Sequence, residues 1–166
     1  MTTPYGWREP LLAAAVARAR ALGETLAARL AELDEDEAAL LAVKELGAAG
    51  LTAFCVPERD GGAAAGALVP PDQVSVRLLC ALRDELAYHS GMLDVMLVMQ
   101  GLGSFPVALG GSQRLRHEAL PRVASGASVA AFALTEPNAG SSLADVETRA
   151  ERRGDKWVLD GRKTFI

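Results

Sequence analysis

The chain has 166 residues, a formal net charge of −4 and a hydrophobic share of 50%, with 5% aromatic residues. This length fits one domain with a real core, and interspersed charges of both signs exclude the basic patches that bind nucleic acid or anionic membranes. We find no apolar run near the ~20 residues of a membrane span. The N-terminus lacks a basic segment followed by an apolar one, so we expect no secretory signal. Cys55 and Cys80 stand outside any CxxC pair, which predicts two small buried residues in a reducing cytoplasm and no zinc site or disulfide.

The first third of the chain predicts two amphipathic helices. Residues 9–33 carry apolar side chains at spacings of three and four, and Pro10 suits the first turn because its missing amide costs nothing there. A second helix is predicted over 35–48, after an acidic turn at 32–37. The apolar positions of the first helix are Leu12, Val16, Ala19, Leu22, Leu26, Leu30 and Leu33.

A third helix is predicted from an N-cap at Asp72 to about His89, after a loop rich in Ala, Gly and Pro over 61–71. Its packed side should carry Val76, Leu79, Leu82 and Leu86. We expect His89 to cap the C-terminal end of this helix, where a partial positive charge is favourable, and not to act in catalysis.

The next helices are expected to be short. One is predicted over 91–101, where Met92, Met96 and Met99 form a stripe that favours core packing. A short helix with a Gly-Gly stop follows from Ser104 to Gly111, and a helix over 113–120, capped by Ser112, should end at Pro121. His117 is expected on its surface.

From Ser128 the pattern becomes extended, with strands predicted over 129–135, 146–153, 156–159 and 162–166. Gly154-Asp155 and Asp160-Gly161 are turn dipeptides. We therefore predict an α+β fold, with an all-α helical domain over 1–127 and the start of a β-domain over 128–166. Strands begun in this way leave an unpaired edge, so the β-domain is expected to be incomplete.

One stretch combines a buried-strand pattern with polar turn chemistry, Ala131 to Ser142. Thr135 ends its apolar run, Pro137 forces an extended backbone before it, and Gly140 tolerates a tight turn. The serines that follow offer hydroxyls and amides that a polar ring edge or an acyl thioester could meet. An ordinary strand followed by a Pro-Gly loop has the same spacing, so the pattern alone leaves both readings open.

Two linked motifs resemble the signature of the acyl-CoA dehydrogenase family. They are Leu-Thr-Glu-Pro-x-Ala-Gly-Ser at 134–141 and Leu-x-Gly-x-Lys-x-x-Ile at 159–166. The passages at 57–62, 84–91 and 110–126 are also similar, so the resemblance covers roughly residues 35–166. It implies a middle domain that is an antiparallel β-barrel, of which this chain would hold the opening strands (a truncated form), and a C-terminal helical domain that this chain lacks.

The resemblance implies FAD-dependent removal of an α-proton and a β-hydride from an acyl thioester, which is α,β-dehydrogenation. It implies flavin contacts along both motifs and a substrate contact at Ser141, while a helix wall of the fatty-acyl pocket would include Val95, Val98 and Met99. The implied cofactor-binding residues are Phe132, Ala133, Leu134, Thr135, Gly140, Ser141, Phe165 and Ile166. The family's base is a carboxylate of the C-terminal domain, so no catalytic residue is assigned here and the base is expected beyond Ile166. Glu136 belongs to the flavin-loop motif and is not expected to be that base, and Lys163 is predicted to be a solvated strand residue.

The family further implies an electron-transfer flavoprotein as acceptor, a homotetramer, a role in fatty acid metabolism and, with the unpaired cysteines, a cytoplasmic location. Ser142 stands where the family usually has aspartate, which raises the prospect of an acyl-carrier thioester in place of acyl-CoA. An oxidase or a flavin-dependent hydroxylase shares the scaffold. A non-catalytic helical module that binds a partner is an alternative of another class, from which bound flavin would distinguish the enzymes. No metal, nucleic-acid or membrane partner is expected.

Overall fold

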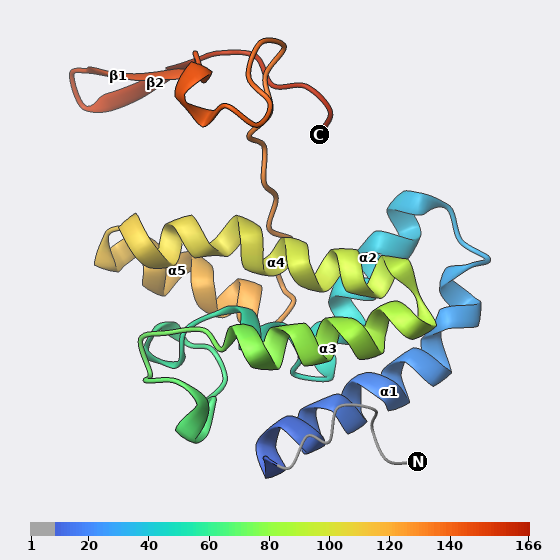
Figure 1. Ribbon diagram of the computed structural model, residues 1–166. Helices are drawn as coiled ribbons and strands as arrows, with labels where there is room; N and C mark the ends of the chain where they lie inside the picture. The colour runs from blue at the N-terminus through green and yellow to red at the C-terminus, as the bar shows by residue number, and fades with distance from the viewer. Residues whose placement is uncertain (1–8) are drawn as a thin grey trace. The chain divides into compact units, whose positions relative to one another are not determined.

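A computed structural model describes residues 9–166, which form two units, one ending at Ala131 and one running from Phe132 to Ile166 (Figure 1). Residues 1–8, on which the expectation about a secretory signal rests, lie outside the described part. The first unit holds α1 (Pro10–Leu30), α2 (Glu35–Ala48), α3 (Val76–His89), α4 (Gly91–Gly110) and α5 (Gln113–Ala124). The second holds β1 (Arg149–Arg153) and β2 (Lys156–Asp160). Helices followed by antiparallel strands confirm the α+β fold.

The helical unit packs around α3 and α4, with α3 between α1 and α4 (Figure 1) and α2 against α4. Its core is built of fully buried leucines, among them Leu12, Leu46, Leu82, Leu93 and Leu97. Pro10 occupies the first turn of α1 as predicted, and the Glu9 carboxylate caps that helix by accepting from the Leu12 N–H at 2.9 Å. Short 3-10 turns at Thr52–Cys55, Glu58–Asp60 and Gly66–Leu68 connect α2 to α3.

Helix α3 begins later than predicted, because Ser75 and not Asp72 is its N-cap. The Ser75 hydroxyl accepts from the Leu78 N–H at 3.3 Å. The buried face is consequently rotated to Leu78, Ala81, Leu82 and Leu86, and Val76 is 72% exposed.

The predicted capping role of His89 is wrong. The Ser90 N–H bonds the Leu86 carbonyl at 2.8 Å, while the His89 ring lies against Gly23 of α1. Its Nε2 lies 3.4 Å from the Glu85 carboxylate, which also holds Arg20 of α1 in a bidentate pair at 2.8 Å.

The predicted break near Gly101 is also wrong, because α4 is continuous across Gly101, Gly103 and Pro106. Gly103 allows close packing, because a Cβ there would lie 2.7 Å from the Ala131 carbonyl oxygen. Pro106 removes one hydrogen bond to the preceding turn, but a buried stripe runs along the whole helix and holds it. The stripe consists of Leu93, Leu97, Gln100, Ser104 and Ala108.

Helix α5 is capped by Ser112 as predicted, but it continues through Pro121 to Ala124. Leu120, Val123 and Ala124 are buried on both sides of the proline, so packing again overrides the local signal. His117 is exposed, as predicted. Of the two cysteines, Cys55 is buried but Cys80 is exposed on α3, which corrects the second prediction.

Helix α4 has the length and composition of a membrane span, with 20 residues and a mean hydropathy of 1.5. The sequence-based statement that no such run exists is therefore wrong for Gly91–Gly110. Core helices of soluble proteins share these properties. In α4, 28% of the apolar window is buried, and its buried stripe, which includes the polar Gln100 and Ser104, packs within the helical unit.

The second unit contains one antiparallel hairpin, in which Arg153 pairs with Lys156 across the turn at Gly154-Asp155. Gly154 has a φ of 62°, as such a turn requires. The predicted strands 129–135 and 162–166 are not strands here, and Asp160-Gly161 ends β2 without forming a hairpin turn. The two segments meet at the single backbone bond from the Thr164 N–H to the Thr135 carbonyl, 3.0 Å, which is too little for a ladder.

Candidate functional site

The Glu136 carboxylate is the organising group of the second unit. Glu136 is 5% exposed and accepts from the backbone N–H groups of Glu147 at 2.7 Å and Thr148 at 3.0 Å, and from the Thr148 hydroxyl. Lys163 Nζ completes the set at 2.8 Å. The Lys163 ammonium and these further donors lower the pKa of Glu136 from the usual 4.5 to about 2, because every partner favours the charged form.

Lys163 and Thr164 join the second motif to the first. Lys163 Nζ also donates to the Leu134 carbonyl at 3.0 Å, and the neighbouring Thr164 N–H donates to the Thr135 carbonyl. The prediction that Lys163 is a solvated residue is therefore wrong. The two motifs are separated in sequence, yet three hydrogen bonds, to Leu134, Thr135 and Glu136, bring them together.

The Leu134–Thr135 segment has backbone donors that are not used within the described residues. Among residues 9–166, the backbone N–H groups of Leu134 and Thr135 make no hydrogen bond, whereas their carbonyls both accept one. The other residues implied by the resemblance are exposed: Phe132, Ala133, Gly140, Ser141, Phe165 and Ile166. Phe165 is 94% exposed and has a φ of 55°. A donor-rich edge flanked by an aromatic residue fits the part of an isoalloxazine ring where carbonyl oxygens and unprotonated nitrogens accept hydrogen bonds.

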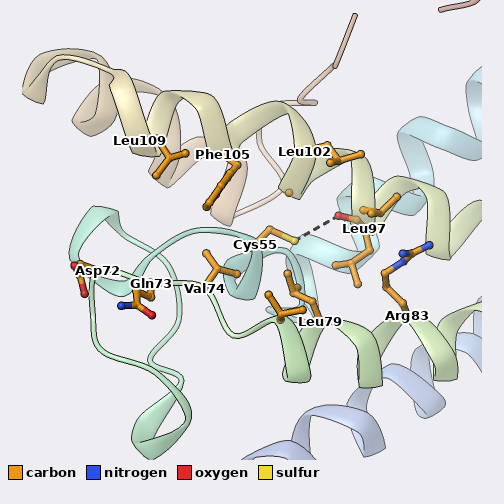
Figure 2. A pocket seen from close by; sticks show the side chains of 13 residues that line it. Cys55, Asp72, Gln73, Val74, Leu79, Arg83, Leu97, Leu102, Phe105 and Leu109 are labelled. Carbon is orange, nitrogen blue, oxygen red and sulfur yellow. Dashed lines mark hydrogen bonds between the residues drawn. The ribbon is translucent and has the colours of Figure 1, made fainter. Parts of the chain in front are cut away.

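A second candidate site lies in the helical unit, in an apolar groove of about 450 Å³ between α3 and α4. Leu102, Phe105 and Leu109 line it from α4, and Val74 and Leu79 lie across from them (Figure 2). Cys55 lies at its floor and donates to the Leu97 carbonyl at 3.4 Å. Burial raises the pKa of the Cys55 thiol to about 12, so this sulfur is neutral and behaves as an apolar surface.

The sequence did not predict that polar residues border this α3–α4 groove. Arg83 pairs with Asp94 through bonds of 2.7 and 2.9 Å that tie α3 to α4, and Asp72 and Gln73 also line the groove. Of the three helix positions expected to line an acyl pocket, Val98 lines the groove, whereas Val95 and Met99 do not. The groove is also lined by three residues that are not labelled in Figure 2, namely Val76, Val98 and Gly101.

Gln100 links α4 to the segment that leads out of the helical unit. Its side chain is fully buried, and its Nε2 donates to the carbonyls of Val123 at 3.3 Å and Ser128 at 2.9 Å. Its Oε1 accepts from the Ala130 N–H at 2.6 Å. A lone amide in an apolar helix, seven residues after Leu93 on the buried stripe, was the signal that could have identified it.

The described residues contain no group of three or more His, Cys, Asp or Glu side chains arranged to hold a metal ion. The two candidate sites offer hydrogen-bond donation at the signature segment and apolar binding in the groove.

Comparison with known proteins identifies the family of the chain. The family model "Acyl-CoA dehydrogenase, N-terminal domain" matches residues 12–127, and "Acyl-CoA dehydrogenase, middle domain" matches residues 131–166. The chain belongs to the acyl-CoA dehydrogenase family, which confirms the resemblance read from its motifs.

Two relatives illustrate the match. The chain is 36% identical over 116 residues to cyclohexane-1-carbonyl-CoA dehydrogenase of Geobacter metallireducens. The aligned region covers 70% of this chain and 28% of that protein. The chain is 35% identical over 152 residues to the probable acyl-CoA dehydrogenase FadE25 of Mycobacterium tuberculosis, covering 89% and 36%. The chain thus spans about a third of the length of these relatives.

Solved structures agree with the fold. A glutaryl-coenzyme A dehydrogenase in complex with glutaryl-CoA matches with a TM-score of 0.75 and 26% identity, over 92% of this chain and 38% of that one. An acyl-CoA dehydrogenase complexed with FAD from Bacillus anthracis matches with a TM-score of 0.75 and 26% identity, over 97% and 27%. A nitroalkane oxidase, at 22% identity and a TM-score of 0.75, shares the fold.

Proposed function

We propose that this chain is the N-terminal and early middle portion of an FAD-dependent oxidoreductase that carries out α,β-dehydrogenation of an acyl thioester. The observation that carries the proposal is the junction of the two motifs, in which Lys163 and Thr164 bond Leu134, Thr135 and Glu136. Family membership and relatives named as CoA-thioester dehydrogenases support it.

In this proposal the Leu134–Thr135 segment donates hydrogen bonds to the polar edge of the flavin, with Phe132, Ala133, Gly140, Ser141, Phe165 and Ile166 as further contacts. FAD, when bound, supplies the acceptor for the β-hydride. Donors at this edge stabilise the negative charge that the ring gains on reduction, because they are already oriented when the charge develops.

The α3–α4 groove is the apolar site that we propose for the acyl chain, with Val98 as a wall residue. Its volume of about 450 Å³ and its lining of aliphatic side chains suit a chain of methylene groups. Ser141 is proposed to contact the thioester.

The base that removes the α-proton is proposed to lie outside this chain. Glu136 does not suit the role, because its four donors and its pKa of about 2 keep it from taking up a proton near neutral pH. A matching base should have a pKa close to the working pH.

The wider setting is proposed from the family: acyl-CoA as the substrate carrier, an electron-transfer flavoprotein as acceptor, a homotetramer, a role in fatty acid metabolism and a cytoplasmic location. Two free cysteines, Cys55 and Cys80, are compatible with a reducing compartment. An oxidase is the second candidate, and the shared fold of the nitroalkane oxidase favours keeping it.

Titration of FAD into the flavin-free protein tests the proposal. Thr135→Val removes one hydroxyl at nearly constant volume and should weaken FAD binding about tenfold, the loss of one buried hydrogen bond. Thr25→Val is the matched control, because the Thr25 hydroxyl bonds only carbonyls of its own helix, those of Ala21 and Leu22. Equal affinity for FAD in the unsubstituted protein and in Thr135→Val, or no FAD binding at all, would contradict the proposal. Oxygen consumption with an acyl thioester would favour the oxidase.

A further inference from the structure

We propose that Lys163 is a positioning residue which, paired with Glu136, holds the Leu134 carbonyl and so leaves the N–H groups of the Leu134–Thr135 segment directed at the site. This inference rests on the proposed function, since it concerns the edge that is to meet the flavin. Lys163 itself touches neither cofactor nor substrate in this proposal and acts through the backbone of Leu134.

The geometry gives Lys163 two partners at once. Its Nζ donates to the Leu134 carbonyl at 3.0 Å and to Glu136 Oε1 at 2.8 Å, and the next residue donates its N–H to the Thr135 carbonyl at 3.0 Å. Two consecutive carbonyls are thereby occupied from one short segment. A peptide carbonyl directed at a flavin carbonyl would be repulsive, so holding both carbonyls on donors of the chain favours contact with those flavin atoms that accept hydrogen bonds.

Charge balance supports the same role. A lone lysine near the ring would add a full positive charge, but the Lys163 ammonium lies against a carboxylate that is 5% exposed and held by three further donors. The pair is therefore close to neutral. What remains at the segment is the partial positive charge of the Leu134 and Thr135 N–H groups and the Thr135 hydroxyl, which make no hydrogen bond within residues 9–166.

An extended segment with free N–H groups could instead pair with a neighbouring strand. In that case Lys163 would stabilise the fold without influencing the flavin. The two readings differ in whether the properties of bound FAD depend on Lys163.

The first arm of the test uses the complete protein without flavin. Lys163→Met removes both donors while keeping an extended side chain, Lys163→Arg retains a cation that can donate to both partners, and Lys156→Met is the matched control on exposed β2. Amide hydrogen exchange is followed at Thr164 and Thr148. We expect exchange at both to rise about tenfold or more in Lys163→Met and to stay near the unsubstituted rate in the other two variants. Unchanged exchange in Lys163→Met would overturn the inference.

The second arm measures FAD affinity and the reduction potential of bound FAD. Lys163→Met should weaken FAD binding about tenfold and lower the potential, and Lys163→Arg should recover most of both. A potential in Lys163→Met equal to that of Lys156→Met, with exchange raised, would overturn the inference in favour of a purely structural lysine. Failure of every variant and of the unsubstituted protein to bind FAD would overturn the proposed function, and with it the flavin role of Lys163.

Discussion

At the scale of single residues, the amide of Gln100 joins three segments of the helical unit. It bonds the end of α5 at Val123 and the exit segment at Ser128 and Ala130, using both donors and its acceptor. A buried amide whose donors and acceptor are all hydrogen-bonded stabilises one arrangement of these segments, because any shift would leave a buried polar atom without a partner.

We therefore expect Gln100→Met, which preserves side-chain length, to lower the free energy of unfolding by about 2–4 kcal/mol, since three partners lose their bonds. Urea denaturation followed by circular dichroism measures it. Gln113→Met, at an exposed position on α5, should change stability by no more than about 0.5 kcal/mol. A loss below about 1 kcal/mol in Gln100→Met would show that the three bonds do not hold the exit segment.

Glu136 predicts a pH dependence confined to the second unit. Its pKa is about 2 in the folded chain against a usual 4.5, so its stabilising contribution is complete above pH 4.5 and is lost as the pH falls from there through about 2. NMR titration of the side-chain carboxyl carbon should give a midpoint near the lower value. In Glu136→Gln, the hydrogen-exchange protection of the Thr148 amide should not change with pH in this window, because no proton is taken up at residue 136. A Glu136 midpoint close to 4.5 would contradict the bonds to Lys163 and Thr148.

At the scale of elements, α1 and α3 approach closely at one glycine. A Cβ on Gly23 would lie 2.4 Å from Cδ2 and 2.7 Å from Cβ of His89, and the Arg20–Glu85 pair holds the same two helices nearby. His89 thus acts in helix packing.

Gly23→Ala should lower stability by about 1–3 kcal/mol, because the clash with the His89 ring exceeds the helix propensity that alanine adds. Thermal or urea unfolding measures the change. Gly91→Ala is the control, since a Cβ there meets nothing within 4 Å, and it should be neutral or slightly stabilising. In a His89→Ala background the cost of Gly23→Ala should fall by about 1 kcal/mol or more. Equal costs in both backgrounds would rule out the proposed contact.

The existence and order of the helices could be read from the sequence, but several of their ends could not. Periodicity located α1, α2 and α3, and Ser112 was the correct cap of α5. Gly101 and Pro121 were interpreted as stops, yet tertiary burial on either side of each carries the helix through. A local signal cannot predict this, because the compensating contacts come from distant residues.

The candidate site was predictable to a similar extent. The motifs identified which residues belong to the signature segment, while the role of Lys163 depends on a bond across 29 positions to Leu134 that no local pattern contains. The strands expected at 129–135 and 162–166 failed for a related reason: a strand requires a partner along its length, and here they share one backbone bond.

At the scale of the whole molecule, the α3–α4 groove is proposed to bind the acyl chain, and two valines on α4 test this proposal. Val98 lines the groove, whereas Val95 is 50% exposed and does not. Val98→Asp should weaken binding of a medium-chain acyl-CoA about tenfold or more, because a carboxylate would have to be buried against methylene groups, and Val95→Asp should leave it within about twofold. Equal effects of the two substitutions, measured by calorimetry, would show that the acyl chain lies elsewhere.

The most direct measurement of the central claim is the visible absorption spectrum of the protein purified from cells that express its complete gene, before and after addition of an acyl-CoA without oxygen. We expect a flavin band that bleaches when acyl-CoA is added, because the bound cofactor would then have accepted the β-hydride. A protein that shows no flavin band even after incubation with FAD, or a band that no acyl thioester bleaches, would contradict the claim.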